Sequence, residues 1–244
     1  MAIIKRICMV IVSLCLLSSE SSAAMIPSGH DLIPAGLGPG DSFQIIFTTN
    51  TKTNAASFGN ADPAFATIAY YDNIVNSDAD ALGFGPSSAN PISWTTVANV
   101  VDGTLATAHS PQLHDVYDST GGIFRTLADG LYFTGTPATS PPDASIEVLS
   151  GGLSNTSVWT GLSLSDPSNL TRALGAQINV RVGSSNSALG GGGWTYGTSA
   201  SPFGNGSLYG LSESLTVAVP EPSTLTLAAL GLLSLGMTRR RRRS

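Results

Sequence analysis

Cysteine is nearly absent from this chain of 244 residues. The sequence contains only Cys8 and Cys15, and both lie within residues 1–23. That segment begins with basic residues, continues with an apolar core and ends with small residues at Ala23, which is the pattern of a secretory signal peptide cleaved after Ala23. The part that remains after cleavage has no thiol. Disulfides and metal sites built on cysteine are therefore excluded from it.

Positive charge is also scarce away from the two ends of the chain. Between Ala24 and Val219 there are four basic residues and 14 acidic ones, which gives a net charge of 4 − 14 = −10. Nucleic-acid binding requires a cationic surface, so this composition argues against a nucleic-acid partner. It makes cations, including calcium, the natural counterions of this central part of the chain. The basic residues of this region are Lys52, Arg125, Arg172 and Arg181.

The C-terminal segment has no apolar run as long as the about 20 residues that usually cross a bilayer. It has the shorter uncharged stretch 224–238, with leucine or alanine on every side of a helix and no polar face for water. Five arginines follow, and arginines favour the cytoplasmic side of a membrane. We therefore expect a hydrophobic C-terminal helix with a membrane stop at its end. The stop consists of Arg239, Arg240, Arg241, Arg242 and Arg243.

The short motif Val219-Pro220-Glu221-Pro222 precedes this apolar stretch. The order of motif, apolar stretch and arginines resembles the PEP-CTERM tail of Gram-negative bacteria. The resemblance implies that residues 219–244 are a sorting and anchor segment read by exosortase, a membrane peptidase that cuts near the motif. It implies export through the inner membrane, transient C-terminal anchoring there, and a final location at the cell surface or outside the cell. The alternative is an ordinary core helix followed by a solvated basic tail.

Residues 24–218, called the body below, lie between the two targeting segments. They are enough for one domain with a sizeable core. The pattern predicts a single β-rich α+β domain with one main helix. That helix is expected to begin with Asp62 as N-cap and Pro63 at its first position. Apolar residues at helical spacing then continue it over residues 64–75.

Short apolar runs separated by turn residues predict the strands of the body. Proline and glycine in residues 24–40 indicate an extended N-terminal segment, and residues 104–114 indicate a weak second helix or a loop. The turn residues Ser119–Gly122 follow Val116-Tyr117-Asp118. The predicted strands are 42–49, 92–97, 123–127, 131–133, 145–148, 157–162, 177–182 and 208–219.

Several short motifs follow one another along the body. The first three are a strand with a threonine-rich turn (45–51), a Gly-Asn-Ala-Asp helix start (59–62) and a tryptophan-containing strand (92–94). A Val-Tyr-x-x-x-Gly turn (116–121) and a Val-Trp-Thr-Gly segment (158–161) come next. A Gly-Gly-Trp loop (192–194) and a terminal strand (208–217) complete the series. This order resembles the small C-type-lectin-like, endostatin-like domain of secreted bacterial proteins. The resemblance implies one lectin-like domain. Such domains usually carry a disulfide anchored in the helix, and here no cysteine is present to form it.

Two aromatic residues are the candidate ligand contacts. Trp194 and Tyr196 follow a run of four glycines, and an aromatic ring in such a loop can stack on a sugar. Trp159 lies instead within an apolar strand, where a tryptophan is more often part of the core. Trp194 and Tyr196 are therefore candidates for ligand contact, with a place in the core as the alternative for Trp194, whereas Trp159 is expected to be buried.

Three residues in the expected loop 76–90 alternate as ligands of a calcium site do. Asn76, Asp78 and Asp80 supply oxygen atoms at every second position. An EF-hand loop also needs glycine at its sixth position and glutamate at its twelfth, and this chain has Ala81 and Ser87 there. The hypotheses that stay open are a calcium site of another type and a solvated loop.

Catalytic residues are not indicated by the sequence. His30, His109 and His114 have no metal-ligand spacing and are expected in exposed loops, and no Gly-x-Ser-x-Gly nucleophile elbow occurs. We expect a non-enzymatic adhesive or exopolysaccharide-associated protein without a cofactor. The alternatives are a secreted hydrolase with paired carboxylates, which sequence alone does not reveal, and a calcium-stabilised carbohydrate-binding module.

Overall fold

The structure is a computed structural model of the chain. It describes residues 24–26, 30–55, 66–89, 91–128, 130–131, 157–162, 168–176, 179–185 and 198–219. Several predicted features lie outside these residues: the signal peptide, the helix start at Asp62 and Pro63, the strand 145–148, the aromatic pair Trp194 and Tyr196, and the tail from Pro220 onward.

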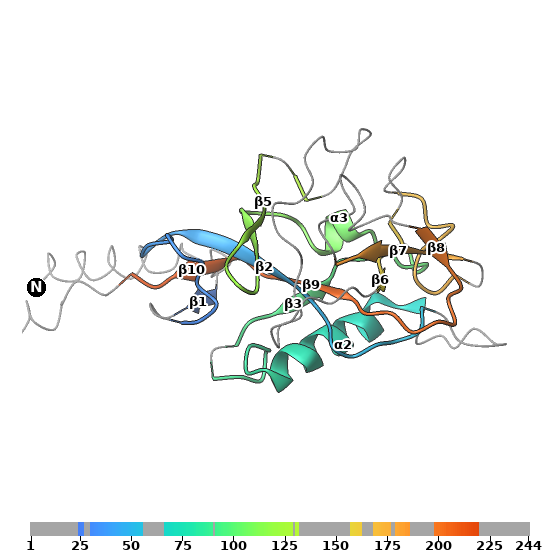
Figure 1. Ribbon diagram of the computed structural model, residues 1–244, viewed down its shortest axis with the longest axis horizontal. Coiled ribbons are helices and arrows are strands. Elements are labelled where there is room, and N and C mark those ends of the chain that lie inside the picture. The colour runs from blue at the N-terminus through green and yellow to red at the C-terminus, as the bar shows by residue number, and fades with distance from the viewer. Residues whose placement is uncertain are drawn as a thin grey trace, which may run out of the picture.

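Most of the described strands belong to one mixed sheet (Figure 1). Its path runs β1-β10-β2-β4-β5, and β9 pairs with both β2 and β3. β2 pairs antiparallel with β10 and β9 and parallel with β4, so it lies at the centre. The strands are β1 (Ala24–Ile26), β2 (Ser42–Thr48), β3 (Trp94–Thr96), β4 (Val116–Asp118), β5 (Ile123–Arg125), β9 (Tyr209–Ser212) and β10 (Leu215–Val217).

The central position of β2 follows from its sequence. Phe43, Ile45 and Phe47 point to one face and Ile46 to the other, and all four side chains are fully buried. A strand with apolar residues on both faces needs cover on both. Phe47 packs edge-on against Trp94 of β3, with ring centroids 4.9 Å apart. The predicted strand 42–49 is confirmed.

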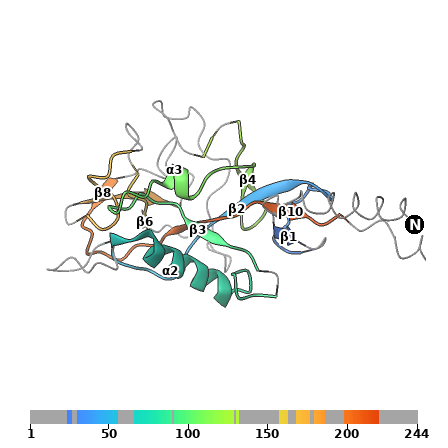
Figure 2. The same cartoon turned by 180° about the vertical axis from the view of Figure 1, so that it is seen from behind.

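A second, three-stranded antiparallel sheet has the order β6-β7-β8. Its strands are β6 (Ser157–Trp159), β7 (Val180–Ser184) and β8 (Thr198–Ala200). Figures 1 and 2 show it at the end of the molecule opposite to β1 and β10. Trp159 is 2% exposed, and its indole Nε1 donates to the carbonyl oxygen of Thr53 at 2.8 Å. The prediction that Trp159 belongs to the core is confirmed.

The main helix, α2 (Ile68–Ala81), packs along β3 (Figure 2). Tyr71, Val75 and Ala79 are its buried residues, and their spacing of four places them on one stripe. Of the predicted range 64–75, residues 64–65 lie outside the described residues, residues 66–67 are not α-helical, and the predicted end is too early. Thr67 is extended, with φ −123° and ψ 139°, so α2 begins after it. The helix also continues through residues predicted to be a loop and ends before Gly83, whose φ of 82° suits glycine.

The turn after β4 is confirmed. Asp118 is buried and its carboxylate Oδ1 accepts hydrogen bonds from the backbone N–H of Thr120 at 2.9 Å and of Gly122 at 2.8 Å. Gly121 has φ 89°, a conformation that favours glycine. The aspartate therefore organises the turn by satisfying two backbone donors that the turn leaves unpaired.

The other predicted elements that the structure describes differ from the prediction mainly in their bounds, and the predicted strand 131–133 lies outside the described residues except for Leu131. The predicted strand 208–219 is two strands, β9 and β10, separated at residues 213–214, and the region 104–114 contains the single-turn helix α3 (Ala106–His109). β1 and β8 were not predicted as strands. The described structure is β-rich with one main helix, which confirms the α+β class.

Candidate functional site

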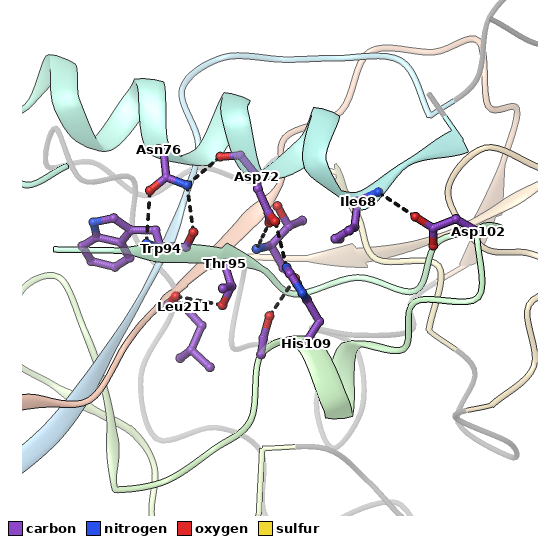
Figure 3. Close-up of polar contacts among 10 residues, drawn as sticks. Ile68, Asp72, Asn76, Trp94, Thr95, Asp102, His109 and Leu211 are labelled. Carbon is purple, nitrogen blue, oxygen red and sulfur yellow. Dashed lines mark hydrogen bonds and ion pairs between the residues drawn. The ribbon is translucent and has the colours of Figure 1, made fainter. Parts of the chain in front are cut away.

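Polar side chains of α2 cover an open edge of β3. β3 pairs with β9 on one side, and α2 lies along the other (Figure 3). The Asn76 amide Nδ2 donates to the Trp94 carbonyl oxygen at 2.8 Å, and the Trp94 N–H donates to Asn76 Oδ1 at 3.1 Å. The Thr96 N–H donates to Asp72 Oδ1 at 2.7 Å. Two helix side chains thus replace the neighbouring strand that β3 would otherwise require.

Asp72 also joins α2 to α3. Its Oδ2 lies 2.9 Å from His109 Nε2, and the two side chains are 21% and 23% exposed (Figure 3). The hydrogen bond to Asp72 raises the pKa of His109 above its ordinary value; burial lowers it in part, and the charges of Asp72 and Asp102 raise it further. The prediction of an exposed loop position for His109 was wrong, because the ring is half-buried and paired.

Asp102 holds the first turn of α2 from a distant loop. Its Oδ2 accepts the Ile68 N–H at 3.0 Å (Figure 3). Its Oδ1 accepts the Thr104 N–H at 2.8 Å. Burial alone would raise the pKa of Asp102, but the hydrogen bonds from Thr104 and Ile68 outweigh it and lower the pKa. A carboxylate at a helix N-terminus also interacts favourably with the helix dipole. It supplies the acceptor that Thr67, the N-cap, does not provide.

The arrangement of these groups indicates a positioning role. An Asp–His pair becomes catalytic when the imidazole can activate a nucleophile. Within the described part of the chain, Asp72 is the hydrogen-bond partner of the His109 ring, and both oxygens of Asp72 are occupied. The pair therefore joins α2, α3 and β3. Sequence reasoning missed it because the two residues are 37 positions apart; the only signal was the helical spacing of Asp72.

The candidate calcium residues lie in the last turns of α2, so the loop assigned to them was wrong. Their side chains have separate partners. Asn76 contacts Trp94, as described above, Asp78 accepts the Thr51 N–H at 2.9 Å, and Asp80 accepts the Ser87 N–H at 2.7 Å. Within the ranges that the structure describes, no group of three or more histidine, aspartate or glutamate residues could hold a metal ion.

Two of the few basic residues converge on one hydroxyl. Arg172 donates to Ser199 Oγ at 2.8 Å, and Arg181 of β7 donates to the same atom at 2.9 Å. Arg172 is exposed and Arg181 partly so. Two guanidinium groups are therefore held close together beside the small sheet, on a body with a net negative charge.

The described structure ends where the predicted tail begins. Ala218 follows β10 directly, and its N–H donates to the Ile26 carbonyl oxygen of β1 at 2.9 Å. Val219 is the one residue of the predicted sorting motif that the structure describes, and it is 53% exposed. Residues 218–243 match the family described as the PEP-CTERM protein-sorting motif.

The chain carries a PEP-CTERM protein-sorting motif. The match supports the predicted PEP-CTERM motif, and its residues overlap the predicted segment 219–244. Proteins with this motif are substrates of exosortase, a membrane protein, so the motif indicates export and sorting through a C-terminal signal. The match covers the tail, and the body has no such support: no curated protein and no solved structure matches the chain. The lectin-like resemblance of the body is therefore not confirmed.

Within the described residues, no helix has the length and apolar character needed to cross a membrane. The predicted C-terminal helix and its five arginines lie outside those residues, as does the signal peptide.

Proposed function

We propose that this protein is an exported, non-enzymatic component of the cell surface or extracellular matrix. In this proposal exosortase cuts near Pro220-Glu221-Pro222, and Arg239–Arg243 hold the removed segment at the cytoplasmic side until cleavage. The β-rich body is then released to associate with exopolysaccharide. The signal peptide at residues 1–23 directs the first step, which is export through the inner membrane.

The observation that carries this proposal is the junction between fold and motif. The sorting motif starts at residue 218, immediately after the last strand of the sheet ends at Val217. A sorting signal that directly follows a folded domain is suited to sorting that domain intact. The Asp72–His109 pair has a structural use in this body, because Asp72 accepts the Thr96 N–H as well and so holds α2, α3 and β3 together.

The pair Arg172 and Arg181 supports contact with an acidic polysaccharide. Guanidinium groups bind carboxylates and sulfates through charge-assisted hydrogen bonds, and Ser199 holds two of them within reach of one anion. The many carboxylates elsewhere on the body would repel the same polymer. Screening limits that repulsion to about 8 Å at physiological salt, so a local cationic pair can still bind. Trp194 and Tyr196 remain candidates for stacking on sugar rings.

Sorting is tested by replacing Pro220, Glu221 and Pro222 together with alanine in the producing cells. The matched control is Ser223→Ala, next to the motif. We expect the triple variant to stay in the membrane fraction with its tail attached, whereas the control is released and cut. Mass spectrometry of both termini in membrane, surface and culture fractions measures this. Normal release of the triple variant, or unchanged release from cells without exosortase, would contradict the proposal.

Polysaccharide contact is tested by co-sedimentation of the exported protein with the purified exopolysaccharide of its own cells. We expect Arg172→Gln to weaken binding about tenfold, the loss of one charge-assisted contact. Lys52→Gln removes an exposed charge elsewhere on the body and should change binding less than twofold. Binding that depends on neither arginine would refute this contact, and abolition by EDTA would favour the calcium-stabilised alternative.

A further inference from the structure

The first strand of the body lies beside its last. β1 runs parallel to β10, with Ala24 opposite Leu215 and Ile26 opposite Val217. On the other side of β10 lies β2, which pairs with it antiparallel. The residues next to the predicted signal-peptide cleavage point and the residues next to the sorting motif are therefore neighbours in one sheet, although nearly the whole chain separates them.

Hydrogen bonds hold β10 from both sides up to the start of the motif. On the β1 side, Ala24 N donates to the Ser214 carbonyl oxygen at 3.2 Å, and Ala218 N donates to that of Ile26 at 2.9 Å. On the β2 side, Gly40 N donates to the Val217 carbonyl oxygen at 2.9 Å and Val217 N donates to that of Asp41 at 3.0 Å. After cleavage behind Ala23, the nitrogen of Ala24 is the α-amino group, which still donates.

The two faces of β1 differ sharply. The side chain of Ile26 is 1% exposed and packs in the same core cluster as Leu215 and Val217. The side chain of Met25, one residue earlier, is 61% exposed. β1 is thus anchored by one buried side chain and by backbone hydrogen bonds, without a disulfide or a metal ion in the described residues.

We propose that Ala24–Ile26, the segment freed by signal-peptide cleavage, docks on β10 and fixes the point at which the sorting segment leaves the fold. This inference rests on the proposed sorting function. Peptidases bind their substrates as extended chains whose backbone groups are free to pair with the enzyme. Ser214 to Ala218 have those groups engaged by β1 and β2. Docking of β1 therefore confines cleavage to the chain beyond Ala218 and protects β10 from trimming by other proteases.

The first experiment compares Ile26→Asp with Met25→Asp in the exported protein. Both add the same charge, one at a buried and one at an exposed position of the same strand. We expect amide hydrogen exchange at Ala218, whose N–H donates to Ile26, to accelerate at least about tenfold in Ile26→Asp, because a buried carboxylate undocks β1. Met25→Asp should stay within about twofold of wild type. Mass spectrometry should find C-termini inside residues 213–218 only in Ile26→Asp.

A second variant keeps the inference testable if Ile26→Asp fails to fold. Neighbouring strands lie about 4.8 Å apart, within the about 4.4–6.8 Å between Cα atoms that a disulfide spans. The pair Met25→Cys and Thr216→Cys, opposite each other in register, should therefore cross-link in the exported protein, which has no other cysteine. The control pair is Met25→Cys with Ser42→Cys, two strand spacings apart, and should not cross-link.

These outcomes separate the docking of β1 from the sorting function. A tail that is retained in wild type, together with faster exchange in Ile26→Asp, would refute sorting and leave docking intact. A tail that is cut normally, together with equal exchange in the two aspartate variants, would refute docking and leave sorting intact. Failure of the Met25–Thr216 cross-link to form in folded, exported protein would also refute docking.

Discussion

The pairing of His109 with Asp72 makes the stability of the body depend on pH. The ordinary pKa of histidine is 6.5, and in the folded protein the pKa of His109 is raised, chiefly by its hydrogen bond to Asp72. The protonated ring is therefore bound more tightly in the folded state than in the unfolded one. This stabilisation is fully present below about pH 6.5 and disappears as the pH rises through the folded-state pKa.

The expected magnitude follows from the exposure of the pair. A hydrogen bond to a charged group contributes about 1.5–3 kcal/mol when buried, and an exposed ion pair contributes about 0–1 kcal/mol. Side chains that are 21% and 23% exposed lie between these cases. We expect the charge-dependent part to be about 1 kcal/mol. The neutral ring can still donate from Nε2 to Asp72, so part of the interaction survives at high pH.

The assay is urea denaturation of the exported protein at about pH 5.5 and about pH 9, on either side of the titration. Wild type should exceed His109→Gln in unfolding free energy by about 1 kcal/mol more at the lower pH than at the higher one. His114→Gln is the control, because the described residues place no carboxylate in an ion pair with that ring. An equal difference between wild type and His109→Gln at both pH values would refute the reasoning.

Three further predictions concern positions at which a single side chain or its absence is required. Gly206→Ala should lower the free energy of unfolding by about 1–3 kcal/mol, because an added Cβ would lie 2.5 Å from the Trp159 indole nitrogen. In the same urea titration, Gly204→Ala should leave the unfolding free energy nearly unchanged, because its added Cβ would meet only ordinary contacts. Asn76→Ala should lower the free energy of unfolding by about 1–3 kcal/mol, because it exposes the edge of β3. EDTA should leave this difference from wild type unchanged. A difference that disappears in EDTA would contradict the structural role of Asn76 and favour a calcium site. Asp118→Ala should lower the free energy of unfolding by about 2 kcal/mol. It should also speed amide hydrogen exchange at Thr120 and Gly122, because their backbone N–H groups lose the carboxylate that accepts them.

The sequence predicts the elements whose cause is local. Apolar residues on both faces identify β2, and Asp118 with Gly121 identifies the turn after β4. Trp159 could be assigned to the core because a tryptophan within a strand is more often buried than exposed. The sorting motif was the clearest case, since a peptidase reads it as a linear segment and its residues need no tertiary contact to carry the signal.

The errors lie where polar residues take their partners from far along the chain. Asn76, Asp78 and Asp80 were predicted to lie in a loop. In the structure their partners are Trp94, Thr51 and Ser87, and α2 continues because Val75 and Ala79 still face the core. The Asp72–His109 pair was missed for the same reason, since neither residue signals the other at any regular spacing.

Two of the misassigned segments have the same physical task. An open sheet edge exposes unpaired backbone groups and invites pairing with another chain. The edge of β3 is closed by the helical residues Asp72 and Asn76, and that of β10 by β1, from a region expected only to be an extended N-terminal segment. With no cysteine after Ala23, the body cannot fasten these edges with disulfides. Segments that resemble loops in the sequence are therefore the ones that close these two edges of the sheet.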